Sequence, residues 1–212
     1  MEENKIEFRE SAGGDLEQRI VEVARRRFIE NGYENTSMSD IAAAAGINRT
    51  ALHYYFRTKE RMFHAVFGSI MLSILPRIQV IFDEDIPLGD KFSKVVDIYF
   101  RIFSENPSLP LFILGEINRD VDHLLDTGRR LHLDSYLSAI EKIISQEMER
   151  GTIKSLPSPV ILLTFMSQVT FPFLAGNLVK SLFGQDDAQF AIFLDHWKQN
   201  IVSQMNHLLE SE

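Results

Sequence analysis

The chain of 212 residues contains no cysteine, which excludes disulfide bonds, thiolate metal sites and a cysteine nucleophile. The first ten residues, MEENKIEFRE, lack a basic region followed by an apolar one, so we expect no secretory signal and a cytoplasmic location. Common catalytic fingerprints are missing as well: there is no G-x-S-x-G, H-E-x-x-H, phosphate-binding glycine loop or dinucleotide motif. The sequence therefore predicts a protein that is not an enzyme and needs no cofactor.

The histidines show no familiar metal-binding spacing. His123 and His132 are nine residues apart, and His196 and His207 are eleven apart. Neither spacing is typical of zinc ligands that share a helix or a short loop. We expect surface or helix-end side chains at these positions, and no metal site.

No uninterrupted run is long and apolar enough to predict a membrane span. The most apolar stretch, Pro159 to Val179, is broken by polar or helix-disturbing residues: Thr164, Ser167, Gln168, Thr170, Pro172, Gly176 and Asn177. These interruptions favour a buried helix or a subunit interface over a membrane partner.

The net charge of −8 disfavours nucleic acid as a partner when taken alone. The acidity is unevenly distributed, however. Residues 15–67 carry eight Arg and Lys against seven Asp and Glu, whereas residues 68–212 carry twelve against nineteen. Attraction to phosphates depends on the local face, so a small basic patch in the first of these segments can still bind DNA.

Apolar residues recur at helical spacing along the chain, and no alternating strand pattern is present. The sequence therefore predicts an all-α fold of about nine helices. The expected helices cover about 15–31, 41–45, 49–55, 59–75, 88–105, 111–122, 125–150, 159–183 and 187–209. We expect the helix from 59 to end before Pro76, and the helix from 159 to bend at Pro172.

Several helix ends carry local signals. Ser37 and Asp40 have the spacing of a capping box. Asn48 and Thr58 are expected to cap the next two helices, and Gly46 suits the left-handed position past a helix end.

The stretch from Ile41 to Phe56, IAAAAGINRTALHYYF, predicts a helix-turn-helix. This motif needs a small residue where its helices cross, a glycine in the turn and an apolar residue that locks the second helix. Ala42, Gly46 and Leu52 meet these three needs. A plain pair of packed helices with ordinary caps is the alternative at this point.

The second helix of this motif offers an outward face that can contact DNA, made of Arg49, Thr50, Ala51, His53 and Tyr54. Arginine can bind guanine through two hydrogen bonds, threonine can touch a thymine methyl, and histidine and tyrosine can hydrogen-bond phosphates or base edges. Thr36, Ser37 and Lys59 stand at helix starts, where hydroxyls, cations and backbone N–H groups suit phosphate.

From Ile20 to Met62 the chain reads IVEVARRRFIENGYENTSMSDIAAAAGINRTALHYYFRTKERM, which strongly resembles the DNA-binding region of the TetR (tetracycline repressor) family. The resemblance implies that the second helix of the motif reads the major groove and that the protein is a homodimer. It also implies that a small ligand in a larger C-terminal domain releases the DNA. The domains expected are a flexible arm at 1–14, a DNA-binding domain at 15–62 with its motif at about 37–56, and a ligand-binding and dimerisation domain at 63–212.

Two positions depart from the family pattern. His53 stands where the family usually has a tyrosine that contacts the DNA backbone, and Thr50 stands where it often has glycine. Histidine can still donate to phosphate, but its charge depends on pH and its reach is shorter. Tyr54 can share this role.

The helices beginning near Ser158 and Asp187 are apolar over much of their surface and resemble the dimerisation pair of the family. The expected interface residues are Phe165, Val169, Phe173, Phe190, Leu194, Trp197 and Ile201. The alternative is that these two helices pack inside one subunit.

A ligand pocket is expected among the C-terminal aromatic residues, mostly apolar with a few polar groups. The candidates are Phe103, Tyr136, Phe165 and Gln168, which suit a largely apolar small molecule. Glu116 either favours a cationic ligand or is a solvated side chain.

The leading prediction is a homodimeric repressor that binds a near-palindromic DNA operator and is released by a small molecule. The alternative is a helical small-molecule-binding or interaction protein whose DNA-binding head has lost its function. The overall acidity of the chain and the presence of His53 favour this alternative. An all-helical enzyme is a third hypothesis.

Overall fold

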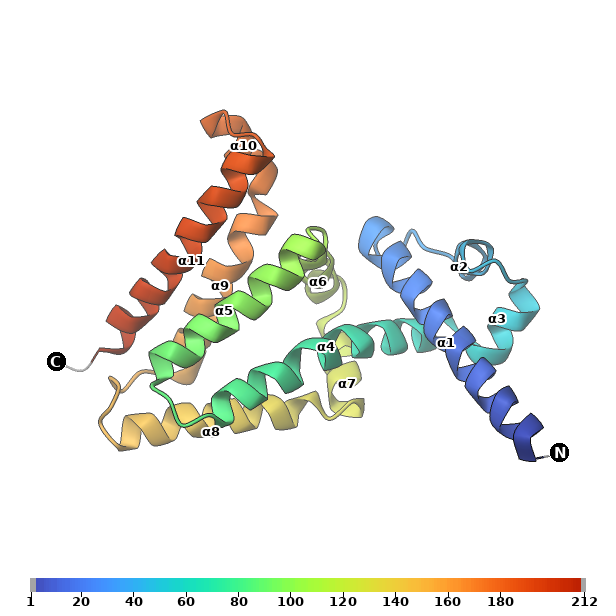
Figure 1. The fold of residues 1–212 in the computed structure, drawn as a ribbon, viewed down its shortest axis with the longest axis horizontal. Helices are drawn as coiled ribbons and strands as arrows, with labels where there is room; N and C mark the ends of the chain where they lie inside the picture. Colours follow the sequence, from blue (N-terminus) through green and yellow to red (C-terminus); the bar gives the residue numbers. More distant parts are fainter. Residues whose placement is uncertain (1–2, 211–212) are drawn as a thin grey trace. The chain divides into compact units, whose positions relative to one another are not determined.

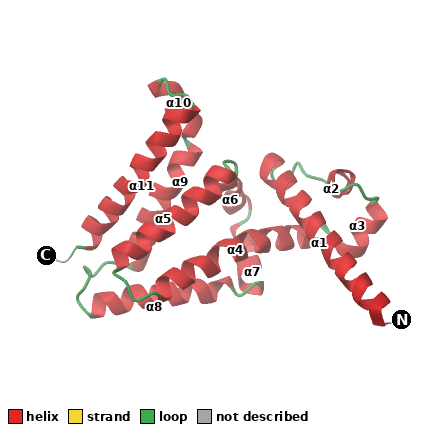
Figure 2. Cartoon of the chain, in the orientation of Figure 1, coloured by secondary structure: helices red, strands yellow, loops and turns green. Residues whose placement is uncertain are grey.

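The computed structural model describes residues 3–210 of the chain, which form eleven helices and no strand (Figures 1 and 2). The helices are α1 (Glu3–Asn31), α2 (Met38–Ala44), α3 (Arg49–Tyr55), α4 (Lys59–Asp83), α5 (Leu88–Glu105), α6 (Leu109–Arg119), α7 (Val121–Arg130), α8 (Leu133–Glu149), α9 (Ser158–Leu174), α10 (Gly176–Phe183) and α11 (Asp187–Leu209). The all-α prediction is confirmed, and the expected number of about nine helices is too low.

The two extra helices come from breaks that the helical periodicity does not mark. The predicted helix at 125–150 is divided into α7 and α8 at His132, whose φ of 54° lies in the left-handed region. The boundary expected between residues 122 and 125 lies instead at Asp120, whose carboxylate accepts the backbone N–H of His123 at 2.9 Å and so caps α7.

The predicted helix at 159–183 is divided into α9 and α10, which are bent by 62°. The break lies at Ala175, and α9 continues through Pro172 to Leu174. Proline removes the N–H that would bond to the carbonyl four residues earlier, here that of Gln168. The indole Nε1 of Trp197 in α11 donates to that carbonyl at 3.0 Å. This bond lets α9 tolerate an internal proline and ties it to α11.

Two helix ends differ from the prediction. α4 does not end before Pro76 but runs to Asp83. Its buried isoleucines continue at helical spacing past the proline, with Ile74, Ile78 and Ile81 all less than 9% exposed. Burial of this face outweighs the local cost of the proline. α1 begins at Glu3 instead of Asp15, so part of the predicted flexible arm is helical, in line with its many good helix formers.

The chain divides into two compact units. The N-terminal unit comprises the residues up to Leu72 together with Phe112–Leu131, and the C-terminal unit comprises Ser73–Leu111 together with the residues from His132. The division therefore does not fall at the expected boundary of 62 and 63. A segment of α6 and α7, expected in the ligand-binding domain, belongs to the N-terminal unit.

The core of the N-terminal unit is formed by apolar side chains that face inward from α1 to α4. Those with no exposed surface include Ile20, Phe28, Ile41, Leu52 and Phe63. Burying each stabilises the fold by roughly 1.5–3 kcal/mol. Leu52, expected to lock the second helix of the helix-turn-helix, is thus buried.

The core of the C-terminal unit lies between α5, α9 and α11 (Figure 1). The rings of Phe92 and Phe165 are 5.1 Å apart, and the ring of Phe173 lies 5.2 Å from Phe100 and 5.4 Å from Phe103. These contacts join α5 to α9 within one chain.

Within residues 3–210, α4 is long and apolar enough to span a membrane, and α9 with α10 would pass the same test as one bent segment. Core packing accounts for the apolar face of α4. Its residues Met62, Phe63, Val66 and Ile70 have no exposed surface.

Candidate nucleic-acid interface

The turn between α2 and α3 is fixed by backbone geometry. Gly46 has a φ of 68°, which a side chain at this position would disfavour. Its N–H donates to the carbonyl of Ala43 at 3.1 Å, and the N–H of Ile47 donates to that of Ala42 at 3.0 Å. These bonds satisfy carbonyls at the end of α2 and set the direction in which α3 leaves the turn.

Both helices of the motif have the caps that the sequence predicts. The Ser37 hydroxyl accepts the N–H of Asp40 at 3.1 Å, and the Asp40 carboxylate accepts the N–H of Ser37 at 3.0 Å, which completes the capping box. The Asn48 side chain accepts the N–H of Ala51 at 2.7 Å and caps α3. The start and orientation of α3 therefore follow from short-range sequence signals.

α3 presents an open face. Leu52 is fully buried and Phe56 is 5% exposed, so these two residues hold the helix down. Arg49, Thr50 and His53 are exposed, and Tyr54 is 83% exposed. An apolar ring with so much exposed surface is unusual in a lone monomer and suits a contact with another molecule.

The other predicted contacts on the motif divide into two groups. Ser37 is exposed at the start of α2, and Ala51 is half-buried on α3. Thr36, however, is only 2% exposed, and its hydroxyl bonds the carbonyls of Arg27 and Gly32 at 3.1 and 2.9 Å. Its side chain is committed to the end of α1, which corrects its assignment as a phosphate contact.

Lys59 is also engaged inside the unit. Its Nζ donates to the carbonyl of Glu34 at 3.2 Å and lies 4.4 Å from the centre of the Tyr33 ring. The side chain therefore links the start of α4 to the loop after α1. The sequence did not predict this role, because both partners are 25 or more residues away.

Sequence reasoning missed a buried ion pair behind this loop. Glu116 is 4% exposed, and its carboxylate accepts the Nε of Arg119 at 2.8 Å. The Arg119 guanidinium lies 4.2 Å from the centre of the Tyr33 ring. Burial raises the pKa of Tyr33, against the lowering effect of Arg119. The expectation that Glu116 is solvated is wrong, and its charge is balanced inside the protein.

The predicted pocket residues lie in and beside the aromatic core of the C-terminal unit. Phe103 and Phe165 are buried in that core, and Tyr136 on α8 is half-buried. The Oε1 atom of Gln168 is buried without a hydrogen-bond partner among the described residues. Tyr99 lies beside Phe165 at 6.3 Å between ring centres, and burial raises its pKa to about 12.

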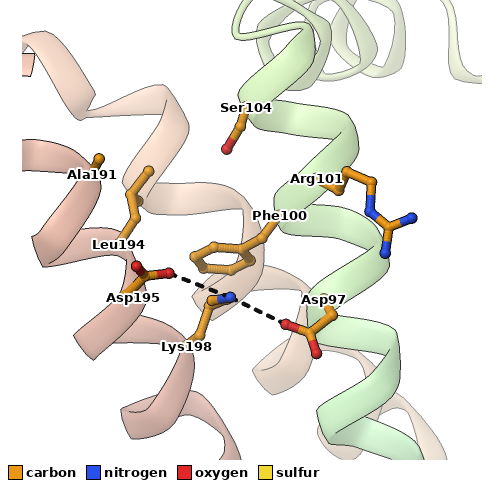
Figure 3. Close-up of a pocket in the computed structure, with 8 residues that line it drawn as sticks. All are labelled: Asp97, Phe100, Arg101, Ser104, Ala191, Leu194, Asp195 and Lys198. Carbon is orange, nitrogen blue, oxygen red and sulfur yellow. Dashed lines mark hydrogen bonds and ion pairs between the residues drawn. The ribbon is translucent and has the colours of Figure 1, made fainter. Parts of the chain in front are cut away.

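Three cavities of about 390, 490 and 680 Å³ open in the C-terminal unit, and none of them is lined by those four predicted residues. The smallest lies between α5 and α11 (Figure 3). In it the Lys198 ammonium lies 3.2 Å from Asp97 and 3.4 Å from Asp195. Burial alone would lower the pKa of Lys198, but the two aspartates raise it above its ordinary value. This cavity is charged and internally paired, unlike the apolar pocket expected.

Three of the seven predicted interface residues lie inside one chain. Phe165, Val169 and Ile201 are less than 5% exposed, so the structure corrects their assignment to a surface between subunits. The remaining four, Phe173, Phe190, Leu194 and Trp197, are half-buried. The large apolar side chains that are more than half exposed on α9, α10 and α11, hereafter the α9–α11 apolar residues, are Leu163, Phe171, Leu178, Leu182, Phe183 and Ile192.

Comparison with known proteins bears on the DNA-binding region first. Residues 20–66 match the sequence model of a family described as bacterial regulatory proteins, tetR family. The chain is similar to the fatty acid metabolism regulator protein of Bacillus subtilis (strain 168), with 24% identity over 135 residues, 64% of this chain and 69% of the relative. It is similar to the nucleoid occlusion factor SlmA of Shewanella frigidimarina (strain NCIMB 400), with 25% identity over 169 residues, 77% and 82% of the two chains.

The fold is similar to that of a solved structure, the transcriptional regulator FadR from Bacillus subtilis in complex with stearoyl-CoA. The TM-score is 0.68 at 19% sequence identity, and the match covers 88% of this chain and 97% of that one. At this level of identity the similarity establishes a common fold.

Proposed function

We propose that the chain is a transcriptional repressor of the TetR family that leaves its operator when a small molecule binds. The match of residues 20–66 to the family model and the similarity to a fatty acid metabolism regulator support this proposal. The observation that carries the proposal is the open face of α3, held outward by the buried Leu52. Catalysis has no part in this proposal, and the cytoplasm is the compartment where such a regulator meets DNA.

In the proposed complex α3 lies in the major groove. Arg49 binds a guanine through two hydrogen bonds, while Thr50 and Ala51 lie against neighbouring bases. His53 and Tyr54 reach phosphates or base edges, and the exposed Ser37 hydroxyl contacts phosphate. Lys59 acts mainly by holding the start of α4, since its ammonium already meets Glu34 and Tyr33.

The proposed functional form is a homodimer built on the α9–α11 apolar residues. Leu163, Leu182 and Phe183 are 70%, 68% and 72% exposed, and such surfaces are costly in water when they are contiguous. Two copies of α3 related by a two-fold axis then read a near-palindromic operator, with half-sites separated by about 34–36 Å or somewhat more.

The proposed effector carries a long apolar chain. The FadR structure of similar fold contains stearoyl-CoA, which makes this compound the first probe. In the present chain the acyl part would insert among Phe103, Tyr136 and Phe165. The buried Oε1 of Gln168, which has no hydrogen-bond partner among the described residues, offers a polar anchor there.

The test is a fluorescence-anisotropy titration of the full chain on labelled DNA from the region flanking its own gene, at low and physiological salt. The proposal expects saturable, sequence-specific binding that stearoyl-CoA reverses. No binding even at low salt, with stearoyl-CoA still bound by the protein, would favour a helical ligand-binding protein with an inactive DNA head. DNA binding that is indifferent to stearoyl-CoA would overturn the effector assignment alone.

A further inference from the structure

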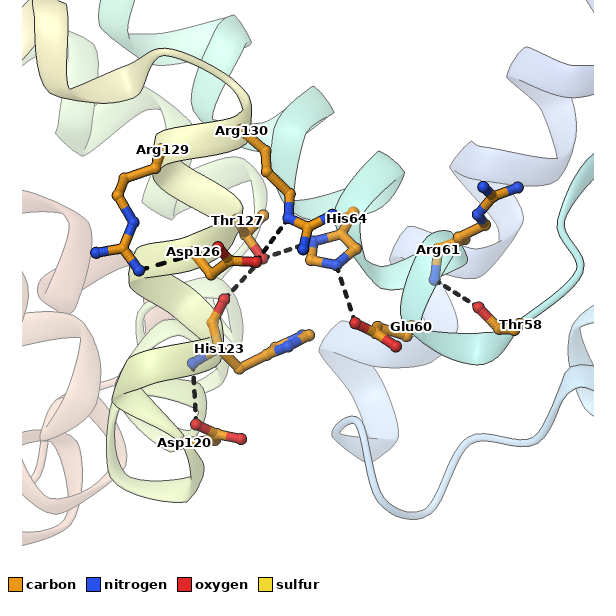
Figure 4. Close-up of polar contacts among 10 residues, drawn as sticks. All are labelled: Thr58, Glu60, Arg61, His64, Asp120, His123, Asp126, Thr127, Arg129 and Arg130. Atoms are coloured by element: carbon orange, nitrogen blue, oxygen red, sulfur yellow. Dashed lines mark hydrogen bonds and ion pairs between the residues drawn. The ribbon is translucent and has the colours of Figure 1, made fainter.

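Three side chains of types that bind metals come together in the N-terminal unit (Figure 4). Glu60 and His64 lie on successive turns of α4, and His123 comes from α7. One ligand atom from each lies within 4.8 Å of the others. The two imidazole rings are 4.9 Å apart, and the Nε2 of His64 is 3.5 Å from a Glu60 carboxylate oxygen.

Thr127 determines which nitrogen of His64 carries the proton. Its hydroxyl donates to the backbone carbonyl of His123 at 2.9 Å, which uses the only proton it has. The same oxygen lies 2.6 Å from Nδ1 of His64 and must therefore accept a hydrogen bond from that nitrogen. In the neutral ring Nε2 then bears a lone pair, the form in which histidine binds metals.

The lone pair of His64 faces other electron-rich atoms. The Nε2 atoms of His64 and His123 are both buried without a hydrogen-bond partner among the described residues, and a Glu60 carboxylate oxygen lies 3.5 Å from the first of them. The His64 lone pair and a carboxylate oxygen 3.5 Å from it are mutually repulsive until a cation lies between them.

We propose that Glu60, His64 and His123 form a binding site for Zn²⁺. Two imidazoles and one carboxylate, with a fourth position left to water, are a donor set that zinc accepts. Tetrahedral zinc with bonds of about 2.0–2.2 Å places its ligand atoms about 3.4 Å apart. The distance of 3.5 Å between His64 Nε2 and the Glu60 carboxylate already matches this separation. Rotation of the His123 side chain would bring its nitrogen to the same separation from the other two ligand atoms.

Thr127 is the positioning residue of this site. It is fully buried and holds the His64 ring by Nδ1 while also bonding the backbone of His123, so it fixes both ligands at once. Sequence reasoning missed the site because it compared histidines by their separation along the chain. Glu60 and His64 have the helical spacing of four residues, but the third ligand is 59 residues further on.

The experiment uses the full chain without a histidine tag, and Zn²⁺ in competition with a chromophoric chelator. We expect one Zn²⁺ per chain, and Co²⁺ in its place should give visible absorption bands of a tetrahedral site. His64→Gln and His123→Gln should weaken binding by more than the roughly 10–100-fold that loss of an outer hydrogen-bond partner costs, and Thr127→Val by about that amount. His196→Gln, an exposed histidine on α11, is the matched control and should leave affinity unchanged.

Equal Zn²⁺ affinity in the wild-type chain and the His64→Gln/His123→Gln double variant would overturn the proposal, as would the absence of stoichiometric binding. Circular dichroism checks the fold of each variant. If a histidine variant does not fold, Glu60→Gln decides the matter, because Glu60 is exposed and its loss leaves the packing intact. Unchanged affinity in that variant would count against the site. The assay contains no DNA, so its result is independent of operator binding.

Discussion

At the scale of single residues, the proposed recognition of DNA depends on a few exposed side chains of α3. Residues 15–67 have an excess of only one positive charge, so general attraction to phosphates is weak. Arg49 is exposed at the first position of α3, where the Asn48 cap holds the helix start. A well-placed arginine here contributes more to specificity than the net charge of the unit.

Arg49→Ala should weaken binding to the specific operator by about 1–3 kcal/mol, because a bidentate contact with guanine would be lost. Affinity for unrelated DNA should fall much less. Fluorescence anisotropy on both DNAs measures the two effects, with Arg150→Ala, at the C-terminal cap of α8, as a control for removing a positive charge. A folded Arg49→Ala protein with wild-type operator affinity would show that this residue does not read a base.

The Ser37–Asp40 capping box makes stability depend on pH. Hydrogen bonds from the Ser37 hydroxyl and backbone N–H hold the pKa of Asp40 below its ordinary value of 3.8. Because the folded-state pKa is depressed, this stabilisation is present above pH 3.8 and is lost as the pH falls through the folded-state value.

Thermal unfolding followed between about pH 5 and pH 2 tests this sign. The melting temperatures of wild type and Asp40→Asn should differ at the upper end of the range and converge at the lower end. For Ser37→Ala the difference from wild type should shrink over the same range but not vanish, since the hydroxyl bonds the carboxylate and also accepts the Asp40 N–H. A difference that stays constant over the whole range would contradict the argument.

At the scale of helices, the clearest interdependence is that of Pro172, Gln168 and Trp197. The proline leaves the Gln168 carbonyl without its helical partner, and the Trp197 indole supplies a replacement at 3.0 Å. A defect inside α9 is thus compensated by a side chain of α11. The two helices should be coupled energetically beyond their apolar contact.

Trp197→Phe should destabilise the chain by about 1–3 kcal/mol in urea unfolding, because a buried carbonyl loses its donor. In a Pro172→Ala background the residue 172 N–H can bond that carbonyl again. The same tryptophan substitution should then cost measurably less, and this double-mutant cycle isolates the hydrogen bond from the loss of ring volume. Equal costs in the two backgrounds would show that the indole acts by packing alone.

Local signals explain which features were predictable from sequence. The caps at Ser37, Asn48 and Thr58 each depend on residues three positions apart, and all three are present in the structure. The outward face of α3 was predictable because Leu52 had to be buried. The breaks at His132 and Ala175 lack such a short-range signature, so the periodicity ran through both of them.

Long-range contacts explain what was missed. Thr36 and Lys59 look free beside a helix start, but Arg27 and Tyr33 engage them once the chain is folded. In the same way, Phe165 and Val169 have the spacing of an interface helix and are in fact core residues. Apolar residues at helical spacing predict that one face of a helix is buried. Only the folded structure shows whether that face is buried by the same chain or by a second chain.

At the scale of the whole molecule, both the excess of acidic residues and the exposed apolar side chains favour the proposed dimer. Residues 68–212 hold most of the negative charge, so the homodimer proposed above would gain DNA affinity by pairing two DNA-binding units. The α9–α11 apolar residues offer the surface for that pairing.

Leu182→Glu combined with Phe183→Glu should convert the dimer to a monomer, because two charges would be buried at the interface without partners. Sedimentation velocity measures the change, and operator affinity should fall with it. Leu137→Glu, which places a charge at a 55%-exposed leucine on α8, is the control. A double variant that sediments like the wild type would place the dimer interface elsewhere.

The Tyr33 ring, with Arg119 of α6 at 4.2 Å and Lys59 of α4 at 4.4 Å, has a thermodynamic consequence. A cation on an aromatic ring contributes about 0.5–2 kcal/mol, depending on how far it is desolvated. If an effector withdraws Arg119 from the ring, the chain loses at most this free energy. The loss of DNA affinity that the effector causes through this contact is then at most about 2- to 30-fold. Linkage is reciprocal, so operator DNA must lower the affinity of the chain for the effector, through the same contact, by the same factor.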